Sequence, residues 1–375
     1  MLLKKLIITS ILFMCCSFYA YAVEIPTISA RSAVLINAET KEVIFEKNAH
    51  EMRSMASTTK IMTSLIAIES GRLNDVVTAE NMQAEGTSIG LKDGYKLSLE
   101  SLVWGMMLES GNDAAKLVAN HIAGSEERFA VLMNNKAHQI GMMNTNFVTS
   151  SGLDSEGHYS TAYDMALLGA YAIDNPLFRE ICSSKRKKVE FIEPAIVRYF
   201  SNHNRLLSMC DGVFGIKTGF TKKSGRCLVS ACERDGVVLV AVTLNAGDDW
   251  NDHIKLYNYG YDVCVKEEVY VRFPDSIRVY GGEQSCVPIS LADDTIKLSF
   301  VDTTSKITQR VLLPEFVYAP IKCGDIVGKA QLIKDGEVIC ERDILCSQSV
   351  GALAPVPDEG NFFKRIFNEI IDIFK

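Results

Sequence analysis

Three short polar segments that lie far apart in the chain constrain its fold more than any other feature. They are a Ser-x-x-Lys at residues 57–60, a Ser-x-Asn at 110–112 and a Lys-Thr-Gly at 217–219. Each pattern is common by itself: Ser-x-x-Lys occurs again at 184–187, and the Lys-Ser-Gly at 223–225 is nearly a copy of the third. All three in this order, each in a fitting local context, indicate segments that the fold brings together in one site.

Hydrophobic periodicity predicts an α+β domain over residues 23–265. Short apolar runs at 33–37 and 43–45 flank a polar segment and predict a β-hairpin. Helical spacing and capping residues predict helices from 57 to 71, from Ser98 as N-cap, over 114–122, from Ser125 as N-cap, over 162–172 and over 250–264. Strands are expected at 212–217, 226–232 and 237–244. An N-terminal hairpin that joins three late strands, with a helical insert between them, gives a mixed layered domain.

The composition of the chain shifts near residue 266. From 266 to 350 it consists of short β-like runs separated by Gly, Pro and Asp turns, which predicts a small all-β, sandwich-like domain. Residues 351–360 are rich in Ala, Pro and Gly and are interpreted as a linker. A chain of 375 residues is long enough for two or three domains.

The last segment, 361–375, is predicted to form an amphipathic helix. Its apolar residues recur at helical spacing, and charged and amide side chains fill the opposite face. With a rise of 1.5 Å per residue the helix is about 20 Å long, too short to span a bilayer but suited to lie on a membrane surface. The alternative is a terminal helix docked on its own domain. The preceding linker and the phenylalanines favour the membrane surface.

The N-terminus has the pattern of a secretory signal peptide. Lys4 and Lys5 precede an apolar run over 6–18, and the Ala-Tyr-Ala at 20–22 places small residues at the two positions that signal peptidase reads. We therefore expect cleavage of residues 1–22 and export, to a periplasm or to the outer face of the cytoplasmic membrane of a single-membrane cell. An uncleaved N-terminal anchor is the alternative. A lipoprotein is disfavoured because bulky residues precede Cys15.

Nine cysteines remain after removal of the signal peptide, an odd and high number. An oxidising compartment allows disulfides with at least one thiol left over, but the sequence does not give the pairing. Several of these cysteines lie in apolar strand-like runs, where the alternative is a small buried hydrophobic side chain. The net charge of −7 argues against nucleic-acid binding, and without HExxH or CxxC spacing no metal site and no cofactor is expected. The basic run at 185–188 is interpreted as a solvated loop.

The first polar segment contains the groups that serine acyl transfer needs. A serine hydroxyl is a weak nucleophile at neutral pH and requires a base. Lys60 follows Ser57 by three residues, so a helix places its amine one turn from the hydroxyl. To act as a base, Lys60 needs a pKa far below its ordinary value of about 10.4, which burial and a nearby cation such as Lys217 can provide. The backbone N–H of Ser57, at a helix N-terminus, would stabilise an oxyanion.

The second and third segments supply polar groups for a substrate. Ser110 and Asn112 are expected in a short loop between two helices, where Ser110 relays a proton to a leaving amine and Asn112 holds a substrate carbonyl. Lys217 and Thr218 are expected late on an exposed edge strand, where they bind a terminal carboxylate beside an extended peptide. Gly219 is expected to let the backbone of that peptide approach.

These segments and their neighbours resemble the D-alanyl-D-alanine carboxypeptidases among the low-molecular-weight penicillin-binding proteins. The similarity is carried by residues 55–63, 108–115, 152–154, 159–166 and 215–221. It extends over residues 25–265, with a weaker match in layout beyond. The resemblance implies a β-lactamase/transpeptidase-like fold and a penicillin-sensitive serine peptidase that removes the last D-Ala from peptidoglycan stem pentapeptides.

The resemblance also implies roles for single residues. Ser57 would form the acyl-enzyme and Lys60 would be the base, in a site shaped by polar residues of the other two segments: Ser110, Asn112, Lys217 and Thr218. The backbone N–H groups of Ser57 and Phe220 would form the oxyanion hole. Phe220 departs from the family pattern, because many members carry His there. The implied partners are stem peptides ending in D-Ala-D-Ala, β-lactam inhibitors and, through residues 361–375, a membrane surface.

Three rival interpretations remain open at the level of sequence. A β-lactamase shares the acylation chemistry but needs efficient deacylation. The class that uses a Glu-activated water is disfavoured, because no Glu-x-x-Asn lies between Ser110 and Lys217. A DD-endopeptidase that cuts cross-links is not distinguished by these motifs. A non-catalytic wall-binding scaffold would keep the fold without covalent labelling by penicillin.

Overall fold

The computed structural model describes residues 23–82, 85–291, 296–300, 306–353, 366–367 and 369–372. These residues form two compact units. The first consists of the described chain up to Lys266 together with residues 299–300, and the second consists of the described residues from Glu267 onward apart from those two. The predicted signal peptide and residues 354–360 of the predicted linker lie outside the described residues.

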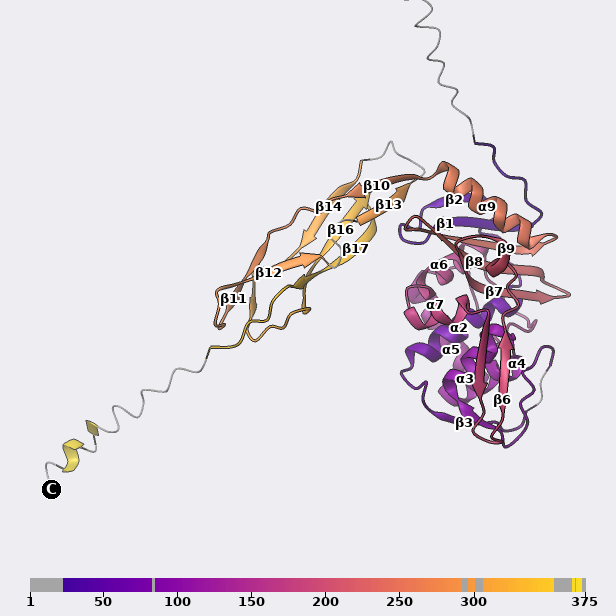
Figure 1. Cartoon of the computed structure of the whole chain (residues 1–375), viewed down its shortest axis with the longest axis horizontal. Helices are drawn as coiled ribbons and strands as arrows, with labels where there is room; N and C mark the ends of the chain where they lie inside the picture. Colours follow the sequence, from indigo (N-terminus) through magenta and orange to yellow (C-terminus); the bar gives the residue numbers. More distant parts are fainter. Residues whose placement is uncertain are drawn as a thin grey trace, which may run out of the picture. The chain divides into compact units, whose positions relative to one another are not determined.

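A five-stranded antiparallel sheet forms the centre of the first unit (Figure 1). Its order is β2-β1-β9-β8-β7, so the N-terminal hairpin joins the three late strands. The strands are β1 (Ser32–Asn37), β2 (Val43–Lys47), β7 (Val213–Thr221), β8 (Gly225–Arg234) and β9 (Val237–Ala246). This confirms the predicted α+β arrangement and places β7 at one edge of the sheet, next to β8.

The sheet separates two apolar cores. Successive residues of a strand point to opposite faces. In β1, Val34 joins the core beneath the helical insert, whereas Leu35 joins the core beneath α9 (Asp249–Val263). Figure 1 shows α9 along one side of the sheet and α6 on the other. The sheet is therefore buried on both faces, and this holds its edge strand β7 in a fixed position.

The helical insert lies between β2 and β7. Its helices are η1 (Ala56–Thr59), α2 (Lys60–Glu69), α3 (Leu99–Leu108), α4 (Asn112–Ala123), α5 (Glu126–Ile140), α6 (Ala162–Ala172), α7 (Pro176–Ser183) and α8 (Leu206–Met209). Ser98 and Ser125 cap α3 and α5 as predicted, each side chain accepting a hydrogen bond from the backbone N–H three residues on. Two short antiparallel pairs complete the unit: β3 (Val76–Thr78) with β4 (Lys96–Ser98), and β5 (Arg186–Glu190) with β6 (Val197–Ser201).

The basic run at 185–188 is not the solvated loop that its composition suggested. Residues 186–188 belong to β5, which pairs along its length with β6. Two of the cations lie over aromatic rings: Lys187 Nζ is 3.9 Å from the ring centroid of Trp104, and Arg186 Cζ is 4.4 Å from that of Tyr199. Strand pairing and cation–π contacts order this segment, although it lacks the alternation of apolar residues from which a strand is predicted.

The described chain from residue 265 to 353 is built from strands, as predicted, and most of it forms the second unit. Its main sheet has the order β14-β16-β17-β12-β11-β15, and a separate pair is formed by β10 and β13. The strands are β10 (Val265–Val269), β11 (Ser276–Tyr280), β12 (Cys286–Leu291), β13 (Ile296–Phe300), β14 (Thr308–Leu312), β15 (Phe316–Tyr318), β16 (Ile326–Lys334) and β17 (Glu337–Cys346). Alternate residues of β11 and β12 point into an apolar core that includes Ile277, Val287 and Ile344.

Part of the predicted C-terminal helix is described. Residues 366, 367 and 369–372 are helical, and the rest of 361–375 lies outside the described residues, so the amphipathic helix stays a prediction. Within the described ranges, no helix combines the length and the apolar character that a membrane crossing requires.

Candidate active site

The three polar segments meet at one groove of the first unit. The groove has a volume of about 490 Å³ and is lined by residues of all three segments and their surroundings: Ser57, Thr87, Ser110, His203, Thr218, Gly219, Phe220, Arg226, Asp249 and Trp250. Among the lining residues that were predicted, Ser57 comes from η1 and Ser110 from the turn between α3 and α4. The other three, Thr218, Gly219 and Phe220, come from β7. Lys60, Asn112 and Lys217 are buried behind this lining. The fold therefore brings the predicted site residues to one place.

Lys60 is the central donor of the site. Its side chain is fully buried, and its Nζ lies 3.0 Å from Ser57 Oγ, 2.7 Å from Asn112 Oδ1 and 2.6 Å from the backbone carbonyl of Ser151. Ser57 is in the last turn before α2, and Lys60 is the first residue of that helix. The three-residue spacing therefore places the amine against the hydroxyl, as the sequence predicted.

The electrostatic surroundings favour an uncharged amine on Lys60. Burial, and next the positive charge of Lys217, hold the pKa of Lys60 well below its ordinary value, while Asp113 opposes the shift. An uncharged amine has two N–H donors and one lone pair. Asn112 Oδ1 and the Ser151 carbonyl accept from the two donors, so the lone pair is left to accept the hydroxyl proton of Ser57.

Lys217 is the second buried cation of the site and holds Ser110. Its side chain retains 1% exposure, and its Nζ donates to Ser110 Oγ at 3.1 Å and to the Thr218 carbonyl at 3.0 Å. Burial lowers the pKa of Lys217 to about 7. Ser110 Oγ therefore lies between a buried lysine and the groove, where a hydroxyl can pass a proton onward.

Asn112 is not placed as the sequence suggested. Its Oδ1 accepts from Lys60, and its Nδ2 donates to the backbone carbonyl of Glu85 at 2.7 Å. Both ends of the amide are thus bound within the protein, and Asn112 is not part of the lining of the Ser57 groove. In this arrangement the amide orients Lys60 instead of holding a substrate carbonyl.

Asp113 directly follows the Ser-x-Asn segment at 110–112 and anchors the chain there by hydrogen bonds. Its buried carboxylate accepts hydrogen bonds from the backbone N–H groups of Ile89, Leu91 and Ala114 and from the hydroxyl of Ser88. These bonds tie residues 88–91 to the start of α4. Ser110, three residues before Asp113, has a φ of +61°, which is unusual for a residue other than glycine.

The Ser151 carbonyl that binds Lys60 could not be predicted from residue types, because a backbone oxygen has no residue signature. Its loop lies directly on η1. A Cβ at Gly152 would be 1.9 Å from the carbonyl oxygen of Ala56, and the φ of Gly152 is +84°, so only glycine fits there.

His158 also holds the loop that contains Ser151 and Gly152. Its Nδ1 accepts from the backbone N–H of Val148 at 2.9 Å, so its Nε2 carries the proton and donates to Thr59 Oγ1 at 2.9 Å. Burial lowers the pKa of His158 to about 4, which keeps the ring neutral at pH 7. His158 thereby connects the helix turn of the nucleophile to the loop that positions the base.

Gly219 and Phe220 complete the strand side of the groove. A Cβ at Gly219 would lie 3.0 Å from the backbone nitrogen of Ser57 and 3.1 Å from that of Thr58. The glycine is thus required first by the protein's own backbone, whereas the sequence suggested the approach of a substrate. Phe220 is 65% exposed and extends the groove outward.

Arg226 and its neighbours Asp249 and Trp250, which the sequence did not single out, also line the groove. Arg226 lies opposite Phe220 in the β7–β8 register, and its Nε donates to Asp249 Oδ1 at 2.8 Å. Its side chain is 44% exposed, so its charge faces the groove beside Thr218. Trp250 Nε1, also in this lining, is a buried donor without a partner among the described residues.

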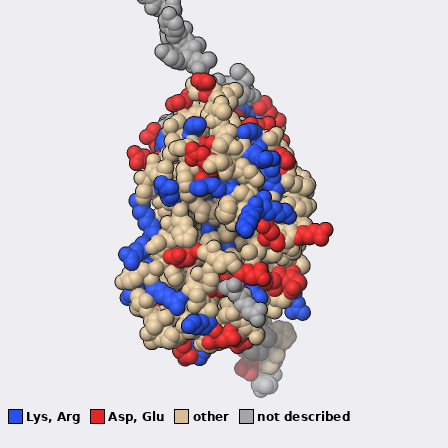
Figure 2. Space-filling model, turned by 90° about the vertical axis from the view of Figure 1, so that its right-hand side faces the viewer, with Lys and Arg blue, Asp and Glu red and all other residues tan. Residues whose placement is uncertain are grey.

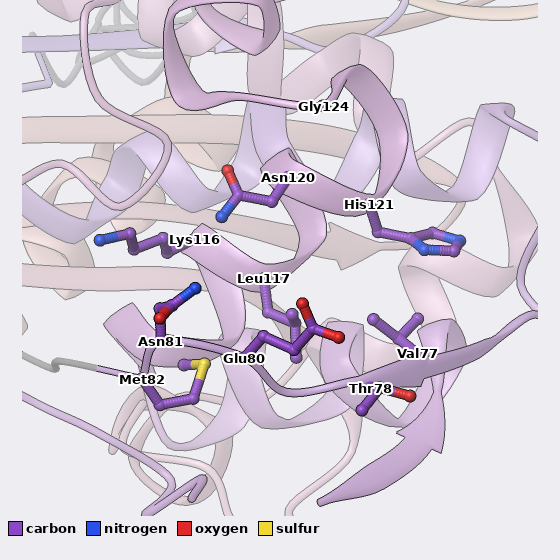
Figure 3. Close-up of a pocket in the computed structure, with 10 residues that line it drawn as sticks. All are labelled: Val77, Thr78, Glu80, Asn81, Met82, Lys116, Leu117, Asn120, His121 and Gly124. Carbon is purple, nitrogen blue, oxygen red and sulfur yellow. The ribbon is translucent and has the colours of Figure 1, made fainter. Parts of the chain in front are cut away.

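A second pocket lies on the far end of α4 and contains none of the predicted site residues. It measures about 410 Å³. Figure 3 shows Lys116, Asn120 and His121 of α4 on one side and Glu80 and Asn81 on the other. Among the described residues, no group of three His, Cys, Asp or Glu side chains is arranged to hold a metal ion. On the face seen in Figure 2, basic and acidic side chains are interspersed.

The sequence matches two family models that together cover most of the chain. Residues 19–248 match the family described as D-alanyl-D-alanine carboxypeptidase. Residues 261–352 match the C-terminal domain of penicillin-binding protein 5.

Named relatives agree with these matches. The chain is 30% identical over 336 residues to the D-alanyl-D-alanine carboxypeptidase DacF of Bacillus subtilis (strain 168), which covers 86% of either chain. It is 32% identical over 379 residues to DacC of Escherichia coli (strain K12), covering 93% of this chain and 89% of the relative.

Two solved structures show the same fold at 28% identity. Penicillin-binding protein 5 from Haemophilus influenzae superposes with a TM-score of 0.64, covering 88% of this chain and all of that one. The Streptomyces K15 DD-transpeptidase superposes with a TM-score of 0.60, covering 64% of this chain and all of that one.

Proposed function

The chain belongs to the D-alanyl-D-alanine carboxypeptidase family of serine-type hydrolases, and we propose that Ser57 is the nucleophile with which it removes the terminal D-alanine from peptidoglycan stem peptides. The observation that supports this proposal most directly is the hydrogen bonding of Lys60. Asn112 Oδ1 and the Ser151 carbonyl accept hydrogen bonds from the two N–H groups of the uncharged amine, and the Ser57 hydroxyl lies against its lone pair. A neutral general base requires this arrangement.

In the acylation step, the hydroxyl proton of Ser57 moves to Lys60 Nζ while Ser57 Oγ bonds to the carbonyl carbon of the penultimate D-Ala. The backbone N–H groups of Ser57 and Phe220 stabilise the oxyanion. Ser110, which Lys217 holds at hydrogen-bond distance, relays to the departing amine the proton that Lys60 accepted, and the C–N bond breaks. Lys60 is then uncharged again. A water molecule then attacks the ester with Lys60 again as base, which releases the shortened peptide. β-Lactams acylate the same serine.

The terminal carboxylate of the substrate is recognised at the strand side of the groove. Thr218 and Arg226 line it together, and the hydroxyl and the guanidinium are both suited to bind a carboxylate. Lys217 adds positive potential from its buried position behind them. The outer edge of β7 pairs with the extended peptide backbone.

Intact-mass spectrometry after benzylpenicillin treatment tests the assignment of Ser57. We expect one adduct per chain, located on Ser57 by peptide mapping and lost in Ser57→Ala together with D-Ala release from diacetyl-Lys-D-Ala-D-Ala. Ser184→Ala is the matched control, because Ser184 begins the other Ser-x-x-Lys pattern and lies outside the groove. Rapid turnover of a chromogenic cephalosporin without D-Ala release would instead assign a β-lactamase.

Residues 1–22 act as a signal peptide and residues 361–375 as a helix on the membrane surface, so the enzyme works in the cell envelope. The charge and apolar patterns of the two termini support this part of the proposal. Deletion from Asn361 onward should release the protein from membranes and leave its D-Ala release intact. Sedimentation of the truncated protein with membranes would contradict the surface anchor.

A further inference from the structure

Two cysteines meet where the catalytic strand β7 begins. Cys210 ends the short helix α8, and Cys232 lies near the end of β8. Their thiols approach the same backbone oxygen: Cys210 Sγ lies 3.9 Å and Cys232 Sγ 3.5 Å from the carbonyl oxygen of Asp211. Cys232 is fully buried, whereas Cys210 is partly accessible. One of the two sulfurs can thus be reached from solution, and the other lies buried at the same carbonyl.

The backbone around the two cysteines is closely connected. The N–H of Val213 donates to the Cys210 carbonyl at 3.2 Å, and Val213 is the register partner of Cys232. One residue further on, the N–H of Glu233 donates to the Gly212 carbonyl at 2.9 Å. A disulfide needs Cα atoms about 4.4–6.8 Å apart. Two cysteines whose thiols share one carbonyl across such a connected turn need little rearrangement to form one.

The surroundings make the two sulfurs chemically unequal. Arg234 Nη2 lies 3.5 Å from Cys210 Sγ. The hydrogen bond from Cys232, together with this guanidinium, lowers the pKa of Cys210 to about 6. The same hydrogen bond and burial raise the pKa of Cys232. Cys210 is therefore the thiolate that attacks first, and Cys232 is placed to react second.

We propose that Cys210 and Cys232 form a disulfide by exchange with an external low-molecular-weight or protein disulfide. The Cys210 thiolate attacks one sulfur of that disulfide, which expels the first thiolate and leaves a mixed disulfide on Cys210. The sulfur of Cys232 then attacks Cys210 Sγ, and its proton passes to the second thiolate as that group leaves. The two cysteines are oxidised, the external disulfide is reduced to two thiols, and no other reactant is needed.

The bond would tie the turn before β7 to β8, and so fix the beginning of the strand that carries Lys217 and Thr218. Two other cysteines of the first unit do not compete with Cys210 as the first nucleophile. Burial raises the pKa of Cys182 to about 12 and that of Cys227 to about 11, so neither is a thiolate that could start the exchange. In the cell the oxidation depends on the proposed export, but with the purified protein it does not.

Peptide mapping of the purified full-length chain tests the bond directly. After incubation with glutathione disulfide and alkylation without reduction, we expect peptide 206–217 linked to peptide 227–234. The second peptide contains Cys227 as well as Cys232, so fragmentation must place the bond on Cys232. Glutathione retained on Cys210, a bond to any other cysteine, or unmodified thiols would each overturn the proposal.

Thermal unfolding gives an independent measure. A disulfide that closes a loop of this length should raise the Tm of the oxidised protein roughly 5–10 °C above that of the reduced protein. Cys210→Ser should abolish this difference, and Cys286→Ser, which removes an exposed cysteine of the second unit, should retain it. Since Cys210 is only partly buried, its replacement tests the bond even if Cys232→Ser does not fold.

Release of D-Ala, measured on the same samples, separates this proposal from the assignment of Ser57. The oxidised protein, the reduced protein and Cys210→Ser should all remain active within about threefold, because neither cysteine lines the groove. Loss of the linked peptide with normal activity would overturn the disulfide alone. A linked peptide in a protein that releases no D-Ala would overturn the proposed function alone.

Discussion

The two units of the molecule differ in the kinds of side chain that they bury. The first unit encloses charged groups: Lys60 and Lys217 are almost completely buried, and so is Asp113. The core of the second unit consists of apolar side chains, and the one buried polar side chain among its described residues is Lys334, which retains 8% exposure. Both units are compact, so the buried charges of the first are not needed to make a stable fold.

The difference shows where the first unit departs from simple packing. A buried ammonium is unfavourable unless it is neutralised or fully hydrogen-bonded. The site meets this requirement with partners for each lysine and with pKa values lowered by burial. Its polar core is thus arranged around proton transfer, whereas the second unit can tolerate any substitution that preserves its packing.

The replacement Lys60→Met is expected to have the largest effect. It removes the base while nearly conserving the side-chain volume, so acylation by penicillin and kcat/KM for D-Ala release should fall by roughly 10⁴-fold. The Tm should change little, because the loss of a buried amine is offset by the two acceptors, Asn112 Oδ1 and the Ser151 carbonyl, that lose their donor. The rate of labelling by fluorescent penicillin measures acylation, and thermal unfolding measures the Tm. A normal acylation rate would exclude Lys60 as the base.

The replacement Lys217→Met should change the pH dependence as well as the rate. Lys60 must be unprotonated to accept a proton, so acylation declines as the pH falls through the pKa of Lys60. The charge of Lys217 contributes to lowering that pKa. Its removal should therefore move the acidic limb of the acylation rate to higher pH, on top of a loss of about 10²-fold in rate. The exposed Lys222, replaced in the same way, should leave the limb in place.

The replacement Arg226→Gln is expected to weaken substrate binding. Loss of a charged partner should raise KM for a D-Ala-D-Ala peptide by about 10-fold, since a hydrogen bond to a charged group contributes about 1.5–3 kcal/mol. A peptide with a C-terminal amide, which has no carboxylate to bind, is the matched control. The ratio of the KM for the amide to the KM for the free acid should be smaller in the variant than in the unchanged protein. An unchanged ratio would show that the substrate carboxylate binds elsewhere.

The replacement Ile344→Ala should have the smallest effect on catalysis. Ile344 is fully buried in the second unit, so its truncation should destabilise that unit by about 2–4 kcal/mol. The kcat/KM for D-Ala release should stay within about twofold. Denaturant unfolding and D-Ala release on one preparation check the two values. If activity falls together with stability, catalysis in the first unit depends on the packing of the second, and the contrast drawn between the two units is wrong.

The sequence predicted the parts of the site that depend on residue type and local spacing. Ser57 and Lys60 are three residues apart on a helical turn, and this alone places amine and hydroxyl together. The short apolar runs with turns between them predicted that the N-terminal hairpin joins three late strands, although not the order of the strands. The family resemblance is confirmed by the matches over both units.

The remaining parts depend on tertiary contacts that leave no local pattern. The Ser151 carbonyl is a backbone atom of a loop without periodicity, and Arg226 resembles any strand arginine until β8 is placed beside β7. The predicted role of Asn112 differed because its amide has two partners, Lys60 and the Glu85 carbonyl, that only the fold brings together.

The open edge of β7 has a consequence for how the protein behaves at high concentration. An unpaired strand edge that can receive a peptide can also receive a strand of a second copy, and the exposed Phe220 adds an apolar surface there. Lys222 and Lys223, both exposed, follow directly after the strand. Their charges disfavour self-association, because edge-to-edge pairing of two copies would bring like charges together. Colloidal stability and access to the groove are therefore governed by the same few residues.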